Sequence, residues 1–373
     1  MANHRHTYTL YSRPSKSGGK IWYYMTYTPD GVRTGGKSTW CESKTAARNY
    51  CDDLLKRGLL YTGINQTFGQ YALGWFDNGS AWLQDRMAIG TVDHPALSES
   101  TLKRFRSDLK NHILPYFEHK KLQEIKPSDV KHFRTWLMQE QKMSPKSVNN
   151  IMSTIKIITD YALADNAILF DPLRGIRPMI VNNKIRDAFS IDEAKRIFSA
   201  AWMSQITKAA NLTAACTGMR MSEILAIKKE NLHETYIDLT NQVYRGKVCP
   251  LKTKAARKVP ITPQLYRILK PLAQNGYAFG SVDAQRIYIH LRNVMTGLHM
   301  DKERVKRNLC FHSWRHFCNT FLLAENVPPV KVAAVLGHST GAGSMQERYT
   351  NWSPDMFPEV YAAQAKLIKM LQL

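Results

Sequence analysis

A stretch near the middle of the chain, Asp171 to Arg186, carries prolines and asparagines and has no helical or strand periodicity. Such a stretch predicts a linker between domains, which we place at residues 173–186. At 373 residues the chain is also too long for one ordinary domain. The sequence therefore predicts separately folded parts on each side of this linker rather than one continuous core.

The N-terminal part, residues 1–65, predicts a small α+β module. Three short runs rich in Tyr, Trp, Val or Thr indicate strands, at Tyr8 to Ser12, Lys20 to Tyr27 and Val32 to Trp40. The third run holds two adjacent glycines, which weaken a strand. A helical pattern follows over Lys44 to Arg57. Basic and aromatic residues alternate here, which indicates either a DNA-binding sheet or ordinary half-buried strand residues.

Residues 66–172 predict a helical domain. Ser100 precedes one amphipathic pattern, Pro127 falls in the first turn of a second, and Ser144 precedes the proline that begins a third. Each pattern has one apolar stripe and an opposite polar face, which is basic in several places. These basic faces are either simply solvated or form one side of a bundle that lies on DNA phosphates.

Residues 187–373 predict a mostly helical domain with a small antiparallel sheet. A capping box from Ser190 to Glu193 begins its first helix. Strand-like runs follow at Tyr236 to Thr240, Gln242 to Arg245 and Lys258 to Ile261. The fold class expected for the whole chain is multidomain and mainly α, with small β elements.

The chain carries 52 Lys and Arg against 30 Asp and Glu, a formal net charge of +22. A polyanion neutralises such an excess with release of counterions, so DNA or RNA is the expected partner. Acidic lipids and acidic proteins are the alternatives, but the excess is spread along the chain, which favours a long nucleic-acid footprint. The side chains that we predict to contact DNA are Arg13, Lys16, Lys20, Lys103, Arg104, Arg106 and Lys146.

The sequence indicates no membrane segment and no metal site. It contains no stretch of about 18 apolar residues, and its N-terminus lacks the apolar run of a signal peptide. The 6 cysteines are scattered without a Cys-x-x-Cys pair, so neither a disulfide framework nor a zinc site is expected. We therefore expect reduced thiols, in a chain that stays in the compartment where it is made.

Several polar residues beyond residue 187 are not required for helices or turns. Arg220 lies between a glycine and an apolar run, and Lys252 lies in a predicted hairpin. His312 and Arg315 are three residues apart, so a helix would place them on one face. Taken singly, each has an ordinary explanation: Arg220 is a surface arginine at a helix start, for example, and His312 a satisfied core histidine.

Two further residues complete this set. His338 follows a glycine at a predicted helix end, and Tyr349 comes eleven residues later, although it is only one of 17 tyrosines. Together, two arginines, two histidines, a lysine and a tyrosine are what phosphoryl transfer to a protein hydroxyl requires.

Four motifs occur in order along the chain: Thr217 to Glu223, His312 to Arg315, Leu336 to His338, and Glu347 to Thr350. They resemble the signature of tyrosine recombinases of the phage integrase family, and in particular an integrase of a phage or integrative mobile element with an N-terminal arm-binding domain. The resemblance implies that the catalytic residues are Arg220, Lys252, His312, Arg315, His338 and the nucleophile Tyr349, with Glu223 in a supporting role. Lys254 is close enough to Lys252 to remain an alternative for the catalytic lysine.

The resemblance also implies a reaction. The tyrosine attacks a DNA phosphate to form a 3′-phosphotyrosine, the lysine protonates the departing 5′-oxygen, and the arginines and histidines stabilise the transition state, without metal, cofactor or ATP. Such enzymes recombine DNA through a Holliday junction, as tetramers on core-type and arm-type sites of double-stranded DNA. Host or element-encoded DNA-bending and directionality factors are possible partners. The expected location is the cytoplasm of a bacterial host, at the nucleoid.

Some alternatives stay open. A helical apolar stripe from Phe357 to Leu371 predicts a tail helix that docks either on its own domain or on a neighbouring protomer. The competing functions are a resolvase of replicon dimers, a type IB topoisomerase-like enzyme and a DNA-binding regulator with an inactive catalytic domain. The N-terminal module argues against the first two, and the complete set of catalytic residue types argues against the third.

Overall fold

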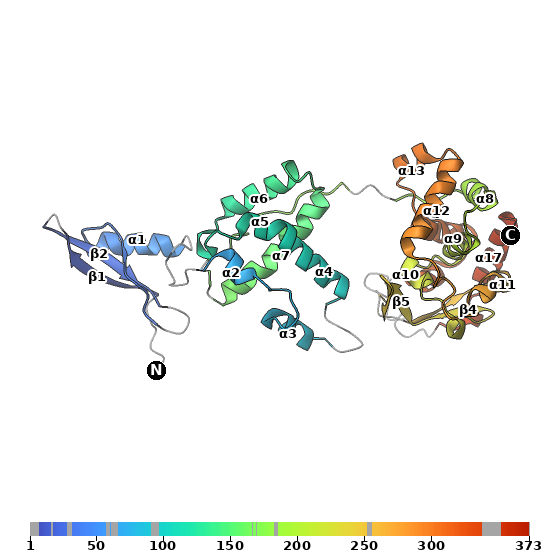
Figure 1. The fold of residues 1–373 in the computed structure, drawn as a ribbon, viewed down its shortest axis with the longest axis horizontal. Coiled ribbons are helices and arrows are strands. Elements are labelled where there is room, and N and C mark those ends of the chain that lie inside the picture. Colours follow the sequence, from blue (N-terminus) through green and yellow to red (C-terminus); the bar gives the residue numbers. More distant parts are fainter. Residues whose placement is uncertain are drawn as a thin grey trace. The chain divides into compact units, whose positions relative to one another are not determined.

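The computed structural model describes residues 7–15, 18–27, 32–56, 60, 66–90, 97–165, 167–168, 170–182, 186–251, 256–337 and 352–372. The chain divides into two compact units, Met1–Asn182 and Asn183–Leu373. The division falls within the stretch from Asp171 to Arg186 in which the sequence predicts a linker (Figure 1).

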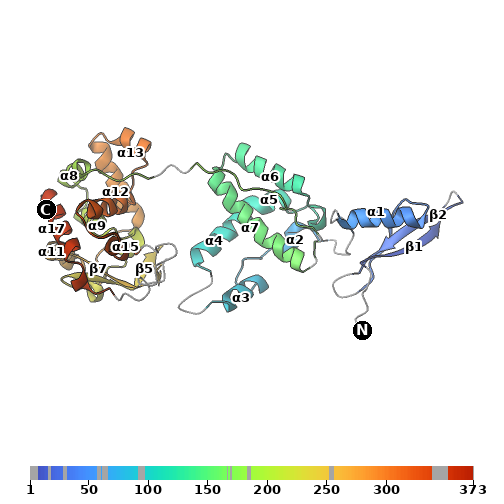
Figure 2. The ribbon, with the colours of Figure 1, turned by 180° about the vertical axis from the view of Figure 1, so that it is seen from behind.

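A small sheet module forms the first part of the chain. Strands β1 (Thr9–Pro14), β2 (Lys20–Met25) and β3 (Lys37–Ser38) pair in this order as an antiparallel sheet. Helix α1 (Lys44–Lys56) lies along one face of β1 and β2, as both ribbon views show (Figures 1 and 2). This arrangement, three strands and a helix, is the one expected from the sequence.

The third strand is much shorter than its sequence pattern. Only Lys37–Ser38 of the predicted run is strand, paired with Tyr23 and Tyr24 of β2. The two glycines bring no side chain to the sheet, and Gly36 lies directly against the hydroxyl of Tyr11, where no Cβ would fit. The strand is therefore confined to the residues that follow the glycines, and before them the run forms only an isolated bridge between Arg33 and Tyr27.

The rest of the first unit is helical, in agreement with the sequence. Its elements are α2 (Phe68–Ala72), α3 (Ala81–Ala88), α4 (Glu99–Asp108), the π-helical segment η1 (Leu109–Ile113), α5 (Leu114–Phe117), η2 (Leu122–Glu124), α6 (Pro127–Gln139) and α7 (Pro145–Ala164). The side chains predicted to face inward from α6, Val130, Phe133 and Leu137, are fully buried.

Local signals place most of these helix ends. Pro127 is at the first position of α6, and Ser144 caps α7 by accepting a hydrogen bond from the Ser147 N–H, as predicted. The start of α4 differs from the prediction, because its N-cap is Ser98, not Ser100. The Ser98 hydroxyl satisfies the free N–H of Thr101, which leaves Ser100 inside the first turn.

The second unit combines many helices with two small antiparallel sheets. Its elements are α8 (Ile191–Ser199), α9 (Gln205–Thr217), α10 (Met221–Ile224), η3 (Lys229–Asn231), β4 (Tyr236–Leu239), β5 (Asn241–Tyr244), β6 (Lys247–Pro250), β7 (Arg257–Pro260), α11 (Pro263–Leu272), α12 (Ala284–Gly297), α13 (Asp301–Arg307), α14 (Ser313–Ala324), α15 (Pro329–Leu336), η4 (Pro354–Met356) and α17 (Pro358–Met370). The predicted capping box of Ser190 and Glu193 is present at α8, and Thr262 caps α11.

Helix α9 lies at the centre of this unit. Nearly every residue in its second half is buried, and it contacts α10, α11, α12, α14 and α17. Around it, β4 pairs with β7 and β5 pairs with β6. The sequence pattern missed β6, whose residues are mostly exposed and therefore lack the alternation of a half-buried strand.

The C-terminal helix α17 docks on its own domain in this single chain. Val360 and Leu367 enter the core, and the amide nitrogen of Gln364 donates to the carbonyls of Cys216 and Pro260 at 3.1 and 2.9 Å. The predicted apolar stripe was slightly misplaced, because Ala365 is exposed while Gln364 is buried. Among the described residues, none of the helices has the length and apolar character needed to span a bilayer.

Candidate active site

The end of α9 forms a turn that presents Arg220. Gly218 ends the helix in a left-handed conformation, with φ of 63°. A side chain at this glycine would collide with Leu336, so the turn packs tightly on the end of α15. Arg220 then occupies the N-cap position of α10, with 21% of its side chain exposed. Part of its guanidinium therefore remains available to a ligand.

Glu223 is a buried carboxylate that fixes Arg220. Its Oε2 accepts a hydrogen bond from the backbone N–H of Arg220 at 2.9 Å, and its Oε1 accepts one from Nη1 of that residue at 2.7 Å. Nη2 of Arg257 lies 2.9 Å from Oε2 of the same carboxylate. Burial acts to raise the pKa of Glu223, but Arg257 and Arg220 together hold it below its ordinary value. The ionised Glu223 thus holds the two arginines, and its supporting role in a reaction stays a prediction.

Arg315 ties three helices together. It lies in the first turn of α14, where its Nη1 donates to the carbonyl of Gly218 at 2.9 Å and its Nη2 to that of Leu336 at 2.7 Å. Burial, followed by the positive charge of Arg220, lowers the pKa of Arg315 to about 10. The guanidinium therefore stays charged at neutral pH.

His312 is neutral at physiological pH. It occupies the N-cap position of α14 and is half-buried. Burial lowers its pKa to about 4, assisted by the nearby His316 and by the positive charges of Arg186, Arg315 and Arg220. A neutral imidazole can donate one hydrogen bond and accept one proton. Arg220, His312 and Arg315 therefore lie within reach of one another's charge, and their catalytic roles stay predictions.

The remaining catalytic predictions fall outside the described part of the chain: Lys252, its alternative Lys254, His338 and Tyr349. Their roles stay predictions. Described elements lie next to them in the sequence: β7 begins at Arg257, shortly after Lys252 and Lys254, and α15 ends at Leu336, shortly before His338. Gly337 then adopts a left-handed conformation, with φ of 64°, as the predicted helix C-cap.

The sequence did not single out three residues of this site. Arg257 binds Glu223, His316 lies with its ring centroid 5.3 Å from that of His312, and Arg186 acts on both histidines. The spacing of His312 and His316, one helical turn, was a readable signal. Arg257 gave only a weak one, because an arginine at the start of a strand is ordinary.

In the sheet module, Arg13 has an aromatic support. Its guanidinium carbon lies 5.3 Å from the ring centroid of Tyr11 and 5.1 Å from that of Tyr23. Such stacking holds a cation at a defined place on the surface. Lys20 is exposed at the start of β2, and Lys16 lies outside the described residues.

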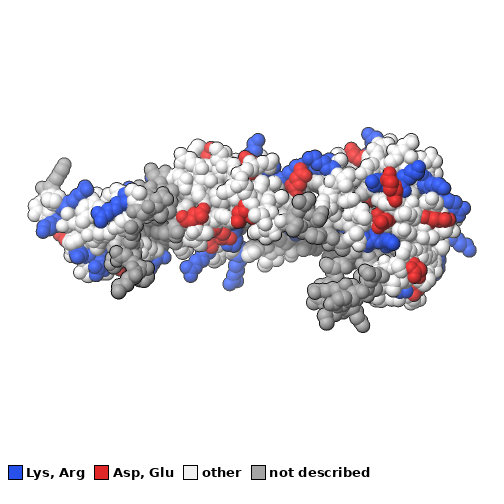
Figure 3. Space-filling model, turned by 90° about the horizontal axis from the view of Figure 1, so that it is seen from below, with Lys and Arg blue, Asp and Glu red and all other residues white. Residues whose placement is uncertain are grey.

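The basic candidates in the helical part fall into two groups. Lys103 and Lys146 are exposed, Lys103 with Glu99 as a partner at 3.2 Å. Arg104 and Arg106 instead bind groups within their own unit, which favours a structural role for them. In the face that Figure 3 shows, Lys and Arg are scattered over the described surface and not gathered in one patch.

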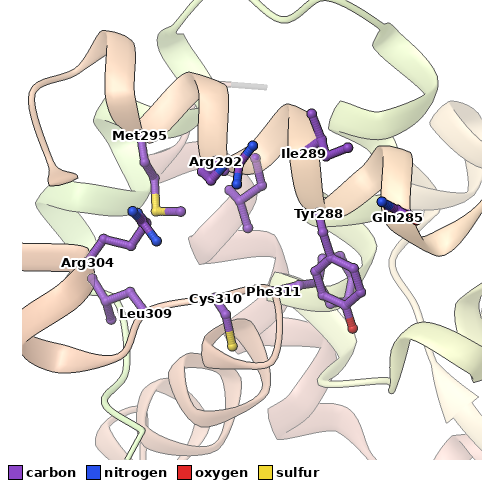
Figure 4. Close-up of a pocket in the computed structure, with 10 residues that line it drawn as sticks. Gln285, Tyr288, Ile289, Arg292, Met295, Arg304, Leu309, Cys310 and Phe311 are labelled. Atoms are coloured by element: carbon purple, nitrogen blue, oxygen red, sulfur yellow. The ribbon is translucent and has the colours of Figure 1, made fainter.

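A pocket of about 200 Å³ lies beside the segment that leads to His312. Figure 4 shows side chains of α12, such as Met295, on one side of it and Leu309 and Cys310 on the other. Arg292 and Arg304 also line it. It contains none of the described catalytic candidates, so it is not the site of the proposed chemistry.

The second unit is a mostly helical domain in which two arginines, a histidine and a supporting glutamate converge beside the end of α15. This fold and this site define the catalytic domain of a tyrosine recombinase. Residues 188–355 match the phage integrase family, and residues 93–138 match the phage integrase N-terminal SAM-like domain. The chain therefore resembles the phage integrase family over most of the second unit and over part of the helical region before it.

Known relatives extend the likeness over most of the chain. The ICEBs1 integrase of Bacillus subtilis (strain 168) is 27% identical over 172 residues, which make up 43% of this chain and 46% of that protein. The prophage ps2 probable integrase of Lactococcus lactis subsp. lactis (strain IL1403) is 24% identical over 300 residues, 70% of this chain and 76% of that protein.

A solved structure shares the fold. It contains a lambda integrase tetramer bound to a Holliday junction, and it matches 92% of this chain and 96% of its own chain, with a TM-score of 0.53 and 18% identity.

Proposed function

We propose that this protein is a site-specific integrase that uses Tyr349 to cleave and rejoin DNA strands, and so integrates and excises a mobile element. The observation that carries the proposal is that His312 and Arg315 lie close to Arg220, which a buried Glu223 holds in place. The partly exposed Arg220 guanidinium, held by Glu223, is suited to an oxygen of a phosphodiester, and the buried Arg315 adds positive charge beside it.

The reaction follows from these groups. The Tyr349 oxygen attacks phosphorus, the bond from phosphorus to the 5′-oxygen breaks, and a 3′-phosphotyrosine forms. Lys252 gives the departing 5′-oxygen its proton, while the phenolic proton passes to a histidine or to water. Arg220 and Arg315 stabilise the charge that develops on the non-bridging oxygens. Attack by a 5′-hydroxyl of a partner strand reverses the step, so the ester conserves the bond energy without ATP.

The assembly is proposed from the relatives. The lambda integrase structure is described as a tetramer bound to a Holliday junction, and both sequence relatives are named integrases. We assign arm-type DNA binding to residues 1–65, core-type binding to 66–172, the linker to 173–186 and catalysis to 187–373. The protein then acts on double-stranded DNA at the nucleoid, in the cytoplasm of its bacterial host, with DNA-bending and directionality factors as further partners.

A nicked suicide substrate tests the proposal. Such DNA loses a short fragment after cleavage, so the covalent complex accumulates and appears as a slower band in a denaturing gel. We expect a complex with the wild-type protein and none with Tyr349→Phe. Tyr361→Phe is the matched control, because the Tyr361 hydroxyl donates to the Thr235 carbonyl at 3.0 Å and has no role in the proposed step. A covalent complex with Tyr349→Phe would refute the assignment of the nucleophile, and none with the wild type on element-end DNA would refute the activity.

A further inference from the structure

Arg257, the first residue of β7, is an arginine whose three nitrogen atoms each contact a partner within the protein. Its Nε donates to the carbonyl of Val335 at 2.9 Å. Its Nη2 and Nη1 lie 2.9 and 3.5 Å from the two carboxylate oxygens of Glu223. Only 10% of the side chain is exposed. Each of the three nitrogen atoms of Arg257 therefore has a partner within the described chain, and the side chain is mostly buried.

The partners of Arg257 belong to two segments that carry the proposed chemistry. Glu223 holds both the backbone N–H and the guanidinium of Arg220. Val335 is the residue before Leu336, whose carbonyl accepts from Arg315. Two arginines from different elements therefore bind consecutive carbonyls at the C-terminus of α15, where a helix leaves its last carbonyls unpaired and its dipole is negative.

The Arg257 guanidinium packs closely against the backbone of Gly337, at the end of α15. Gly337 follows in a left-handed conformation, and a Cβ built on it would lie 2.7 Å from Nη1 of Arg257 and 2.8 Å from its guanidinium carbon. The guanidinium thus lies directly against the backbone of the last described residue before His338. A shift of this group would displace either the glycine or the carboxylate beneath it.

Charge balance explains why a second arginine is needed. Glu223 is completely buried, and an ionised carboxylate in such a place requires compensation. Arg257 supplies it at Oε2, on the side away from the Arg220 guanidinium. Without Arg257, the whole charge of Glu223 would fall on Arg220 and would draw that guanidinium inward, away from the phosphate.

We propose that Arg257 is a positioning residue for strand cleavage. It neutralises Glu223, which leaves the exposed part of Arg220 for the scissile phosphate, and it holds the end of α15 from which the chain continues to His338. This inference rests on the proposed function, because its readout is the cleavage step.

The experiment is single-turnover cleavage of the nicked suicide substrate by full-length Arg257→Lys. A lysine keeps the charge but cannot bind a carboxylate and a carbonyl in one rigid plane. We expect covalent-complex formation to slow on the order of 100-fold, as a displacement of about 1 Å in a catalytic group would cause, with core-site affinity unchanged. Rates are normalised to the folded fraction, measured by circular dichroism, so a loss of stability alone gives a wild-type rate.

Arg307→Lys is the matched control. Arg307 also binds carboxylates and a carbonyl of the same domain, those of Asp187, Glu193 and Ala188. Its substitution should leave the normalised cleavage rate at the wild-type value. A wild-type rate for Arg257→Lys, or an equal loss in both variants, would overturn the proposal.

Two further measurements test whether Arg257 acts through Arg220. On a substrate with a methylphosphonate at the scissile position, which removes the charge that Arg220 balances, the defect of Arg257→Lys should shrink. The defects of Arg257→Lys and Glu223→Gln should also be non-additive in the double variant, because both act on one guanidinium. An undiminished defect together with simple additivity would assign Arg257 another role. Failure of the wild type to form any complex would instead refute the proposed function.

Discussion

Two sets of arginines in this protein look alike in the sequence and differ in their surroundings. Arg104 and Arg106 lie in α4 of the helical part, and their donors reach partners inside that part: Arg104 binds Asp108 and Thr154, and Arg106 binds the Phe76 carbonyl. In the second unit, Arg220 is less exposed than either of them (21% of its side chain, against 35% and 34%), but within the described chain its guanidinium has Glu223 as its one hydrogen-bond partner.

The two sets differ in how many hydrogen-bond partners each guanidinium has within the protein. This number, and not the presence of an arginine in the sequence, separates a group that can bind a ligand from a structural one. Arg104 completes a buried cluster in which the Thr154 hydroxyl also donates to Asp108, at 2.7 Å. Arg220 is instead held from behind by a carboxylate that a second arginine has already neutralised. The first arrangement uses the charge for packing, whereas the second leaves part of it for a ligand.

The largest expected effect is on catalysis, with Arg220→Ala. Removal of one donor that stabilises transition-state charge lowers the rate by about 100- to 1,000-fold. Folding stability should change little, because Glu223 keeps Arg257 and the Arg220 backbone N–H, which the substitution leaves in place. Single-turnover cleavage and thermal unfolding of the same preparation measure the two quantities.

The outcome that would break the comparison is a large fall in melting temperature with an unchanged cleavage rate. Arg220 would then be a structural arginine like Arg104. Thr296→Ala serves as a surface control in the same domain, since within the described chain the exposed Thr296 has Asp301 as its one side-chain partner, at 3.1 Å.

The sequence predicted what is local and missed what is distant in the chain. The caps at Ser144, Ser190 and Thr262 were readable because a cap and its partner lie within three residues. The intramolecular role of Arg104 could not be predicted from the sequence, because its partner Thr154 is 50 residues away. For the same reason the sequence left open whether the basic face of α4 is solvated or binds DNA.

The residues predicted to be catalytic form an intermediate case. Arg220, His312 and Arg315 were predicted from the combination of motifs, and the structure places these three near one another. Arg257 was missed because no motif marks it, and only folding brings β7 against Glu223 and the end of α15. Its role depends on three segments that meet in space, so no spacing along the chain indicates it.

A smaller effect is expected from Arg104→Ala, and it falls on stability. Asp108 is buried and would keep only the Thr154 hydroxyl, so the free energy of unfolding should fall by about 1–3 kcal/mol. Cleavage per folded molecule should not change. Denaturant unfolding and core-site binding at several salt concentrations separate the two possibilities.

Lys103→Ala provides the matched control on the same helix, because Lys103 is exposed and its pair with Glu99 contributes little to stability. Weaker DNA binding by Arg104→Ala at unchanged stability would contradict the structural role. It would place Arg104 among the phosphate contacts that the sequence suggested.

A further effect concerns acid pH and tests the surroundings of His312, which burial, assisted by the nearby positive charges, keeps neutral. Its pKa is about 4 in the folded chain and near 6.5 when unfolded, so between these values the unfolded state binds more protons. Stability should therefore be constant above about pH 6.5 and fall as the pH drops toward 4. In His312→Gln this acid slope should be reduced but not abolished, because burial also lowers the pKa of His316.

The exposed His132 is the control, since His132→Gln should keep the wild-type slope in melts across this pH range. An unchanged slope in His312→Gln would mean that the histidine is not held neutral by its buried, positively charged surroundings.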